Sequence, residues 1–214
     1  MTPPAAQAQG ARRASARQRA ARRRRRAYLL LAAVGAVVIA VAVIAPKFRT
    51  AVQSFGLPLN HASDIRRQAA DKGLDPTLIA GVIFTESKFV DQTSSAGALG
   101  LMQLMPETAR FIAQRSGGTA FTIDDLSTPG VNIAYGSWYL RYLLQLYDGD
   151  EVRALAAYNG GIGNVDKWVE QAQANGRAFS AADIPFPETR AYVERVEKAR
   201  REYAKTYPSE LGIG

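Results

Sequence analysis

The sequence predicts a mainly α-helical domain that follows a single N-terminal transmembrane helix. Beyond the first 60 residues, apolar side chains recur at spacings of three and four, the period of an amphipathic helix. Prolines and aspartates stand where such helices begin, and glycines stand where they end. The alternation of a β-strand is nearly absent, and one uncharged run of 19 residues near the N-terminus is long enough to span a bilayer.

The N-terminal residues 1–26 carry the positive charge excess of the protein. They contain nine arginines and no acidic residue, whereas the rest of the chain has 18 Lys and Arg against 19 Asp and Glu. We expect this segment to be a disordered basic tail, because its composition cannot form a packed core. The remainder has no net attraction to phosphate, so the sequence gives no indication of a nucleic-acid partner.

Residues 27–45 form the predicted transmembrane helix. Arginines crowd its N-terminal side, so the positive-inside tendency places the tail in the cytoplasm and the C-terminal domain outside the cytoplasmic membrane. A cleaved signal peptide is the alternative, but the run exceeds the roughly 7–15 apolar residues of a typical signal, which favours an uncleaved single-pass anchor. Residues 46–60 mix Pro, Gly and polar residues and are expected to be a stem.

The remaining chain is expected to be one domain over residues 61–207, followed by a C-terminal tail at 208–214. Its predicted helices are 63–72, 76–88, 106–115, 129–147, 151–158, 164–175 and 188–206. The helix over 129–147 is the richest in large apolar and aromatic side chains, and we expect it to be the central core helix.

A single glutamate stands out as a candidate catalytic acid. It closes a set of residues with helical i, i+3, i+4 and i+7 spacing: Ile79, Val82, Ile83 and Glu86. Asp75 and Pro76 supply the N-cap and first turn, so Glu86 falls in the last turn of its helix. Partial burial and the negative helix end should both raise its pKa, as a general acid requires. On its own, the position also fits a solvated glutamate that pairs with Lys88.

Three further segments follow Glu86 and Ser87 in order: GALGLMQLMP at 97–106, AYNGGIGNV at 157–165 and PETRAYV at 187–193. With Glu86-Ser87 they resemble the motifs of the soluble lytic transglycosylase family of peptidoglycan-cleaving enzymes. The resemblance covers about residues 60–207 and implies a lysozyme-like fold of the goose type. In that family Ala-Tyr-Asn-Ala-Gly is the commoner form of the second motif, so Gly160 here replaces one small residue with another.

The resemblance and its motifs give a set of candidate substrate-binding residues around Glu86: Ser94, Met102, Gln103, Tyr158, Asn159, Glu188 and Tyr192. Asn132 is a further candidate, because it is a polar residue among apolar ones in the helix over 129–147. We expect Met102 and Gln103 to face the cleft, and Leu101 and Leu104 to lie in the core. For Glu188 a second role stays open, since an acid at a helix N-terminus also favours the helix dipole.

The implied reaction is non-hydrolytic cleavage of the β-1,4 bond between N-acetylmuramic acid and N-acetylglucosamine, which leaves a 1,6-anhydro ring. Glu86 would act first as acid and then as base. One alternative is a hydrolytic muramidase, which needs a second carboxylate, for which Asp91 is the candidate. Another is a non-catalytic wall-binding or assembly protein that keeps the cleft.

No cysteine is present and His61 is the only histidine, which excludes disulfides and thiolate chemistry and leaves no histidine or cysteine metal set. We expect His61 to be a surface or capping residue, and we expect no metal and no cofactor. The expected partners are peptidoglycan glycan strands and, through residues 27–45, the membrane. A single anchor without a wall-binding domain indicates action near the membrane or recruitment by cell-wall assembly partners, which the sequence does not identify.

Overall fold

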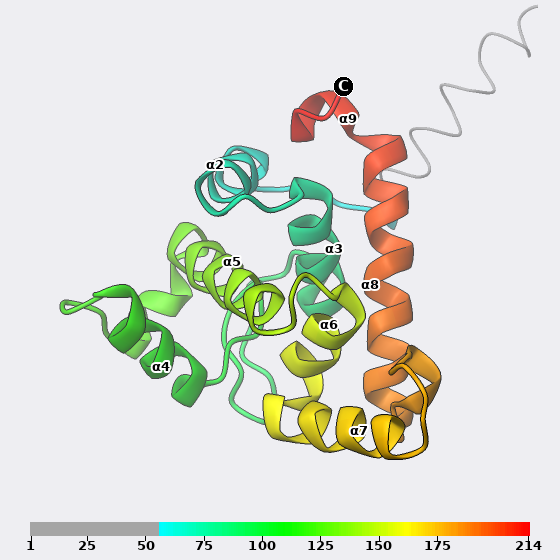
Figure 1. Ribbon diagram of the computed structural model, residues 1–214. Coiled ribbons are helices and arrows are strands. Elements are labelled where there is room, and N and C mark those ends of the chain that lie inside the picture. The colour runs from blue at the N-terminus through cyan, green and yellow to red at the C-terminus, as the bar shows by residue number, and fades with distance from the viewer. Residues whose placement is uncertain (1–55) are drawn as a thin grey trace, which may run out of the picture. The chain divides into compact units, whose positions relative to one another are not determined.

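The computed structural model describes residues 56–214 (Figure 1). The predicted tail at 1–26, the transmembrane helix at 27–45 and residues 46–55 of the predicted stem lie outside the described residues. Among residues 56–214, no helix has both the length and the apolar character needed to cross a membrane. The same residues contain no β-strand, and their only β-type pairing is two isolated bridges, Thr93 with Leu99 and Leu99 with Leu104.

The predicted helices are all present within the described residues, and the mainly α prediction is confirmed. They are α2 (Ala62–Lys72), α3 (Pro76–Ser87), α4 (Pro106–Ser116), α5 (Pro129–Leu146), α6 (Glu151–Gly160), α7 (Ile162–Ala174) and α8 (Pro187–Thr206). Three short elements were not predicted: η1 (Ile123–Ser127), η2 (Ala181–Asp183) and α9 (Pro208–Leu211).

The central helix is α3, not α5, so the prediction for 129–147 was wrong. Most residues of α3 are buried, and Figure 1 shows it between α5 and α8. On α5, the aromatic side chains of Trp138, Tyr139 and Tyr142 stay partly exposed and pack with Phe111 of α4. Helix α3 is apolar on nearly all sides, and such a helix lies in the interior. The tyrosines of α5 each carry a polar hydroxyl, which suits a position at the edge of the core.

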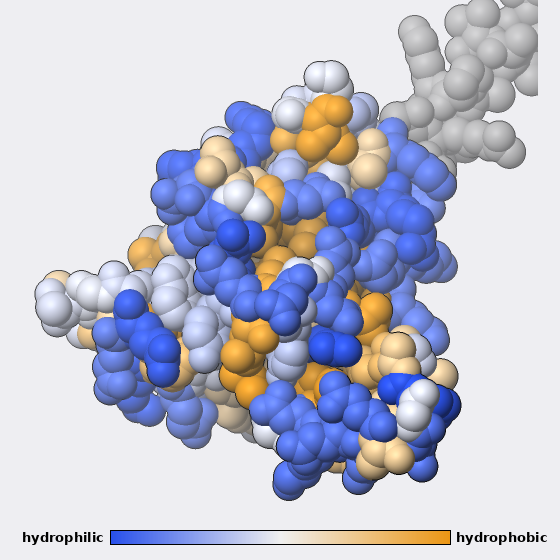
Figure 2. All heavy atoms as spheres, viewed as in Figure 1, coloured by the Kyte–Doolittle hydropathy of each residue, from blue (hydrophilic) through white to orange (hydrophobic). Residues whose placement is uncertain are grey.

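Helix α8 packs closely along α3. A Cβ atom at Gly81 would lie 3.0 Å from the backbone oxygen of Val196, so only glycine permits this approach. Arg200 of α8 also bonds to Asp75, the N-cap of α3, at 2.8 Å. On the face shown in Figure 2, the outer surfaces of α7 and α8 carry mostly hydrophilic side chains.

Both ends of the described domain are packed against the rest of it, the N-terminal end through tyrosines at the end of α8. The hydroxyl of Tyr207 donates to the backbone oxygen of Leu57 at 2.8 Å, and the hydroxyl of Tyr203 donates to that of Pro58. At the other end, Leu211 of α9 is 1% exposed. Residues 57–58 of the predicted stem and 208–211 of the predicted tail therefore contribute to the packed domain.

Candidate active site

Glu86 is the penultimate residue of α3, as predicted. The helix starts at Asp75, whose carboxylate accepts a 2.8 Å hydrogen bond from the backbone N–H of Thr77, and it has Pro76 in its first turn. It stops directly after Ser87, because Lys88 adopts the left-handed conformation with φ 53°. The acid therefore sits where the helix gives way to a loop over residues 88–105.

Burial raises the pKa of Glu86 to about 7, because the charged carboxylate loses its hydration. Two neighbours on α8 act in the opposite direction, namely the hydroxyl of Tyr192 and the positive charge of Arg195. Loss of hydration outweighs both, so the carboxyl is protonated over much of the range below neutral pH. The predicted elevation of this pKa is confirmed.

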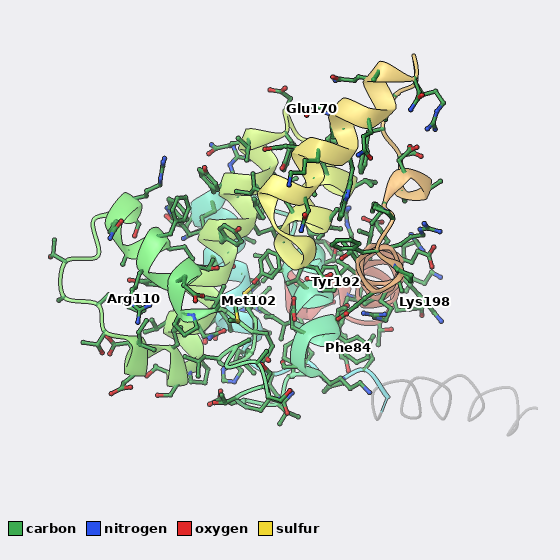
Figure 3. The ribbon with its side chains drawn as sticks, turned by 90° about the horizontal axis from the view of Figure 1, so that it is seen from below. Phe84, Met102, Arg110, Glu170, Tyr192 and Lys198 are labelled. Carbon is green, nitrogen blue, oxygen red and sulfur yellow. The ribbon has the colours of Figure 1, made fainter. Side chains whose placement is uncertain are left out.

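The charge of Glu86 raises the pKa of two buried tyrosines, Tyr158 and Tyr192. Tyr192 is 2% exposed, and its hydroxyl faces Glu86 but has no partner of full hydrogen-bond geometry among the described residues. The negative charge of Glu86 also raises the pKa of Tyr158, whose hydroxyl donates to the backbone oxygen of Met102 at 2.9 Å. Figure 3 shows Tyr192 and Met102 in the interior, whereas Lys198 lies on the outer side of α8.

The loop over residues 88–105 is fixed by two buried polar side chains. Ser87 donates to the backbone oxygen of Leu101 at 2.7 Å, which ties the residue after the acid to the loop. Asn132 of α5 accepts from the backbone N–H of Met102 at 2.8 Å and donates to the backbone oxygens of Leu99 at 2.9 Å and Leu126 at 3.1 Å. The side-chain amide of Asn132 thus satisfies backbone groups that the irregular loop does not pair with one another.

Two side chains that were expected to face the cleft are therefore buried instead. Asn132 is 0% exposed and uses its amide on backbone groups, so it positions the loop and does not face a cleft. Met102 is also 0% exposed, and its side chain packs against Gly136 of α5, where a Cβ atom would lie 2.4 Å from the methionine sulfur. Only the backbone of Met102 reaches the site, through its bond with Tyr158.

Gln103 and Ser94 lie in the same loop and are half-buried. The side-chain nitrogen of Gln103 donates to the backbone oxygens of Gly100 at 2.7 Å and Gln92 at 3.0 Å. Ser94 accepts through its side-chain oxygen from the backbone N–H of Ala98 at 3.0 Å and closes a tight turn with Gly97. Both residues shape the loop, and their contact with substrate stays a prediction.

Asn159 and Glu188 lie at the ends of α6 and α8 and are exposed. The side-chain oxygen of Asn159 accepts from the hydroxyl of buried Thr189 at 2.8 Å, which joins the two helices. Glu188 lies in the first turn of α8 and makes no ion pair with the described residues. This position favours the helix-dipole role that the sequence left open.

The roles of Ser87, Thr189 and Arg195 were not predicted from the sequence. Arg195 follows Tyr192 by three residues, and this spacing on one helix face was a usable signal. The hydroxyls of Ser87 and Thr189 bond to Leu101 and Asn159, which are distant in sequence, so no local pattern reveals their roles. Within residues 56–214, no group of three or more histidines or acidic residues could hold a metal ion.

The fold and the site together define a helical, lysozyme-like domain with one half-buried acid at the end of its central helix. Residues 63–179, more than half of the chain, match the Transglycosylase SLT domain, and the chain belongs to this family.

Named relatives and a solved structure are consistent with this membership. The chain is 32% identical over 147 residues to the soluble lytic murein transglycosylase of Escherichia coli K12, covering 65% of this chain and 22% of that protein. It is 35% identical over 164 residues to the membrane-bound lytic murein transglycosylase C of Salmonella paratyphi B, covering 65% of this chain and 45% of that one.

The structure also resembles that of the lytic transglycosylase Slt from Pseudomonas aeruginosa, solved as an inactive mutant with glutamine in place of a glutamate. The TM-score is 0.65 at 33% sequence identity, and the match covers 75% of this chain and 26% of that chain. The chain therefore spans less than half the length of each of these three proteins.

Proposed function

We propose that the protein is a peptidoglycan lytic transglycosylase that cleaves the β-1,4 bond between N-acetylmuramic acid and N-acetylglucosamine without net addition of water. The family membership and the names of the relatives support this assignment. The observation that carries it is the single half-buried acid at the end of α3, whose pKa is about 7 and whose charge acts on the buried hydroxyls of Tyr158 and Tyr192.

Glu86 supplies both proton transfers in the proposed reaction. In its protonated form it donates the proton to the glycosidic oxygen, and the N-acetylglucosamine side leaves as an alcohol. The resulting carboxylate then removes the proton from the C6 hydroxyl of the muramic acid, whose oxygen bonds to C1 and closes the 1,6-anhydro ring. The acid ends the cycle protonated, so no second carboxylate is required.

The electrostatic neighbours of Glu86 favour this mechanism over hydrolysis. The side chains that shift its pKa are Tyr192 and Arg195, and neither is a carboxylate. Ordinary glycosidases place a second carboxylate about 5 to 10 Å from the acid. Asp91, the candidate second acid, is exposed in the loop.

A hollow beside the tyrosines offers a surface for sugar rings. It has a volume of about 250 Å³ and is lined by the aromatic faces of Phe111 and Tyr139, with Ile162 and Glu107 beside them. The ring of Tyr139 lies 5.5 Å from that of Tyr158, the tyrosine whose pKa is raised by the charge of Glu86. Aromatic faces flanked by polar groups suit the apolar faces and hydroxyls of a glycan strand.

The test is mass spectrometry of the fragments released from purified peptidoglycan by the native protein, Glu86→Gln and Asp91→Asn. We expect anhydro-muramyl products from the native protein and from Asp91→Asn, and none from Glu86→Gln. Reducing-end products that disappear in Asp91→Asn would instead establish a hydrolytic muramidase. A failure of the native protein to release any fragment would leave a wall-binding protein.

We also propose that residues 27–45 anchor the protein in the cytoplasmic membrane, with the N-terminus inside and the catalytic domain facing the wall. The uncharged run and the arginines before it support this topology. A C-terminal alkaline phosphatase fusion should be active and remain in the membrane fraction. An active fusion released in shortened form would mean that the segment is cleaved.

A further inference from the structure

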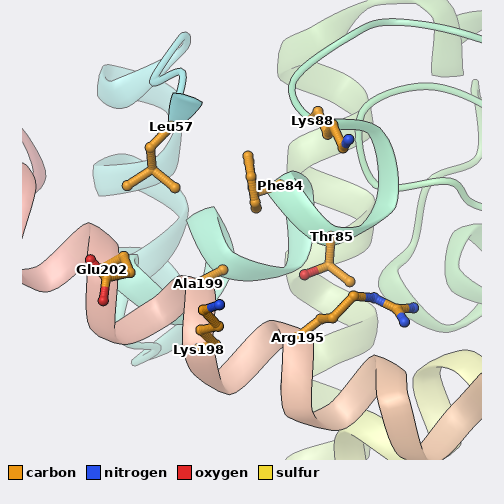
Figure 4. Close-up of a pocket in the computed structure, with 8 residues that line it drawn as sticks. All are labelled: Leu57, Phe84, Thr85, Lys88, Arg195, Lys198, Ala199 and Glu202. Carbon is orange, nitrogen blue, oxygen red and sulfur yellow. The ribbon is translucent and has the colours of Figure 1, made fainter. Parts of the chain in front are cut away.

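A cavity of about 430 Å³ lies between α3 and α8 (Figure 4). Its volume falls within the range of small-molecule sites. Glu86 is not among the residues that line it, so the cavity is distinct from the candidate catalytic acid. The lining comes from the two helices and from one residue near the start of the described domain: Leu57, Phe84, Thr85, Lys88, Arg195, Lys198, Ala199 and Glu202.

One part of the lining is apolar and consists of Leu57, Phe84 and Ala199. Leu57 and Ala199 are buried, and Phe84 is half-buried. The one uncharged polar side chain in the lining is Thr85, whose hydroxyl donates to the backbone oxygen of Gly81 at 2.8 Å. This donor is used within its own helix, so the apolar part suits a hydrocarbon chain better than a polar molecule, which needs hydrogen-bond partners.

Three exposed cationic side chains also line the cavity: Lys88, Arg195 and Lys198. None of them makes an ion pair with a residue in the described part of the chain. The acid in the lining, Glu202, lies 3.6 Å from the ammonium group of Lys205. The described domain therefore leaves the positive charge at the cavity without an acidic partner, and this charge attracts anions.

Leu57 places the cavity next to the point where the described domain begins, since the described residues start at Gly56. The predicted transmembrane helix ends at residue 45. Even a fully extended chain spans at most about 40 Å between residue 45 and Gly56. The proposed anchor would therefore keep the start of the domain, and the cavity beside it, near the bilayer surface.

We propose that the cavity binds an anionic phospholipid of the anchoring membrane, with its phosphate on the three cations and the upper part of an acyl chain against Leu57 and Phe84. The inference rests on the proposed anchor and is independent of the proposed reaction. An anionic lipid joins a phosphate, which lysine and arginine bind by charge-assisted hydrogen bonds, to a hydrocarbon chain, and this pairing matches the two parts of the lining. A bound lipid would hold this face of the domain at the membrane.

The test is photo-cross-linking of the full chain, reconstituted in vesicles of equal parts phosphatidylcholine and phosphatidylglycerol. The probe is phosphatidylglycerol with a diazirine on its acyl chain near the glycerol, and mass spectrometry identifies the labelled residues. We expect label at Phe84 as well as within residues 27–45, which serve as the internal reference. Lys198→Glu should lower the label at Phe84 about fivefold or more relative to this reference, because a cation near an anionic membrane surface contributes about this factor to binding.

Two controls accompany this measurement. Lys167→Glu should leave the relative label at Phe84 unchanged, because Lys167 is exposed on α7 and does not line the cavity. Phosphatidylcholine with the same diazirine should label residues 27–45 as before and Phe84 about fivefold less, because its headgroup has no net charge. Circular dichroism confirms that both variants fold.

Three results would overturn the inference: label within residues 27–45 but none at Phe84, the same relative label at Phe84 in both variants, or equal labelling of Phe84 by the two lipids. A complete lack of label would reject the anchor and the lipid site together. The fragment analysis of purified peptidoglycan uses no membrane and tests the reaction separately. Strand cleavage without label at Phe84 rejects the lipid site alone, and charge-dependent label without cleavage rejects the reaction and keeps the lipid site.

Discussion

The hydroxyl of Tyr158 lies 2.9 Å from the backbone oxygen of Met102 and donates a hydrogen bond to it. This bond joins α6 to the loop over residues 88–105, across 56 positions of sequence. The charge of Glu86 raises the pKa of Tyr158, so the side chain that joins α6 to the loop also lies within the electrostatic range of the acid.

Tyr158→Phe should reduce kcat/KM on peptidoglycan more than it reduces stability. Loss of one hydrogen bond costs about 1 kcal/mol of unfolding free energy, measured by urea denaturation. A loop displaced from the acid should lower kcat/KM by about tenfold or more. Tyr142→Phe is the control, because Tyr142 is half-buried, stacks on Trp138 and makes no side-chain hydrogen bond with the described residues. Equal activity of the two variants would contradict a positioning role.

Gly100→Ala should be far more destabilising than Gly97→Ala. Both glycines have positive φ, 74° and 85°, so alanine adds backbone strain of about 1 kcal/mol at either position. At Gly100 the added methyl group would also lie 2.1 Å from the side-chain nitrogen of Asn132, whereas nothing lies within 4 Å at Gly97. Urea denaturation should therefore separate the two variants by about 2 kcal/mol or more. Similar midpoints would show that Asn132 can move aside.

Asn132→Ala should destabilise the domain by about 2 kcal/mol or more, because it leaves the buried N–H of Met102 and the buried oxygen of Leu126 without a partner, while the oxygen of Leu99 still accepts from Leu104. The exposed amide of Asn175 supplies the control, since it bonds only to Gln171 within the described chain. Asn175→Ala should change the unfolding free energy by less than about 1 kcal/mol. A small effect at Asn132 would mean that water can replace the amide.

The proposed reaction should slow as the pH rises through about 7, because only protonated Glu86 can donate to the glycosidic oxygen. Above this pH, kcat/KM should fall about tenfold per unit. Arg195→Gln should move the alkaline limb to higher pH, since the positive charge of Arg195 lowers the pKa of Glu86. Lys167→Gln should leave the profile in place. A limb that moves downward or stays fixed in Arg195→Gln would contradict this electrostatic role.

Glu86→Gln should stabilise the fold at high pH. The pKa of Glu86 is raised from 4.5 to about 7 on folding, so the acid favours the folded state fully below pH 4.5 and loses this contribution as the pH rises through about 7. The variant should therefore gain up to about 3 kcal/mol over the native protein at pH 8. The difference should vanish near pH 4, as measured by urea denaturation at each pH. A gain that is independent of pH would point to packing instead.

The helices could be predicted because residues close in sequence determine where each helix begins and ends. Asp75 and Asp150 each cap a helix through a side-chain oxygen, and Gly73 and Gly117 end helices with positive φ, as the sequence indicated. Such signals depend on a few adjacent residues. They do not reveal which helix becomes central, since that depends on how well each face packs against the others.

The position of Glu86 could be predicted because it follows from the pattern of a single helix. The surroundings of other site residues could not, because they depend on backbone groups that are distant in sequence. Asn132 looked like a cleft residue because a polar group among apolar ones suggests a ligand. Its partners are instead backbone groups of the loop, up to 33 positions away. The prediction that Met102 faces the cleft was wrong for the same reason. Its side chain packs into space left by Gly136, which lies on another helix.

The absence of a side chain at Gly81 sets the separation between the acid and the residues that control it. Tyr192 and Arg195 stand on α8, and α8 approaches α3 through the backbone contact of Gly81 with Val196. A methyl group here would push the two helices apart and weaken the effect by which both residues lower the pKa of Glu86. The working pH range of the reaction can thus be adjusted from an uncharged interior position that never meets the glycan.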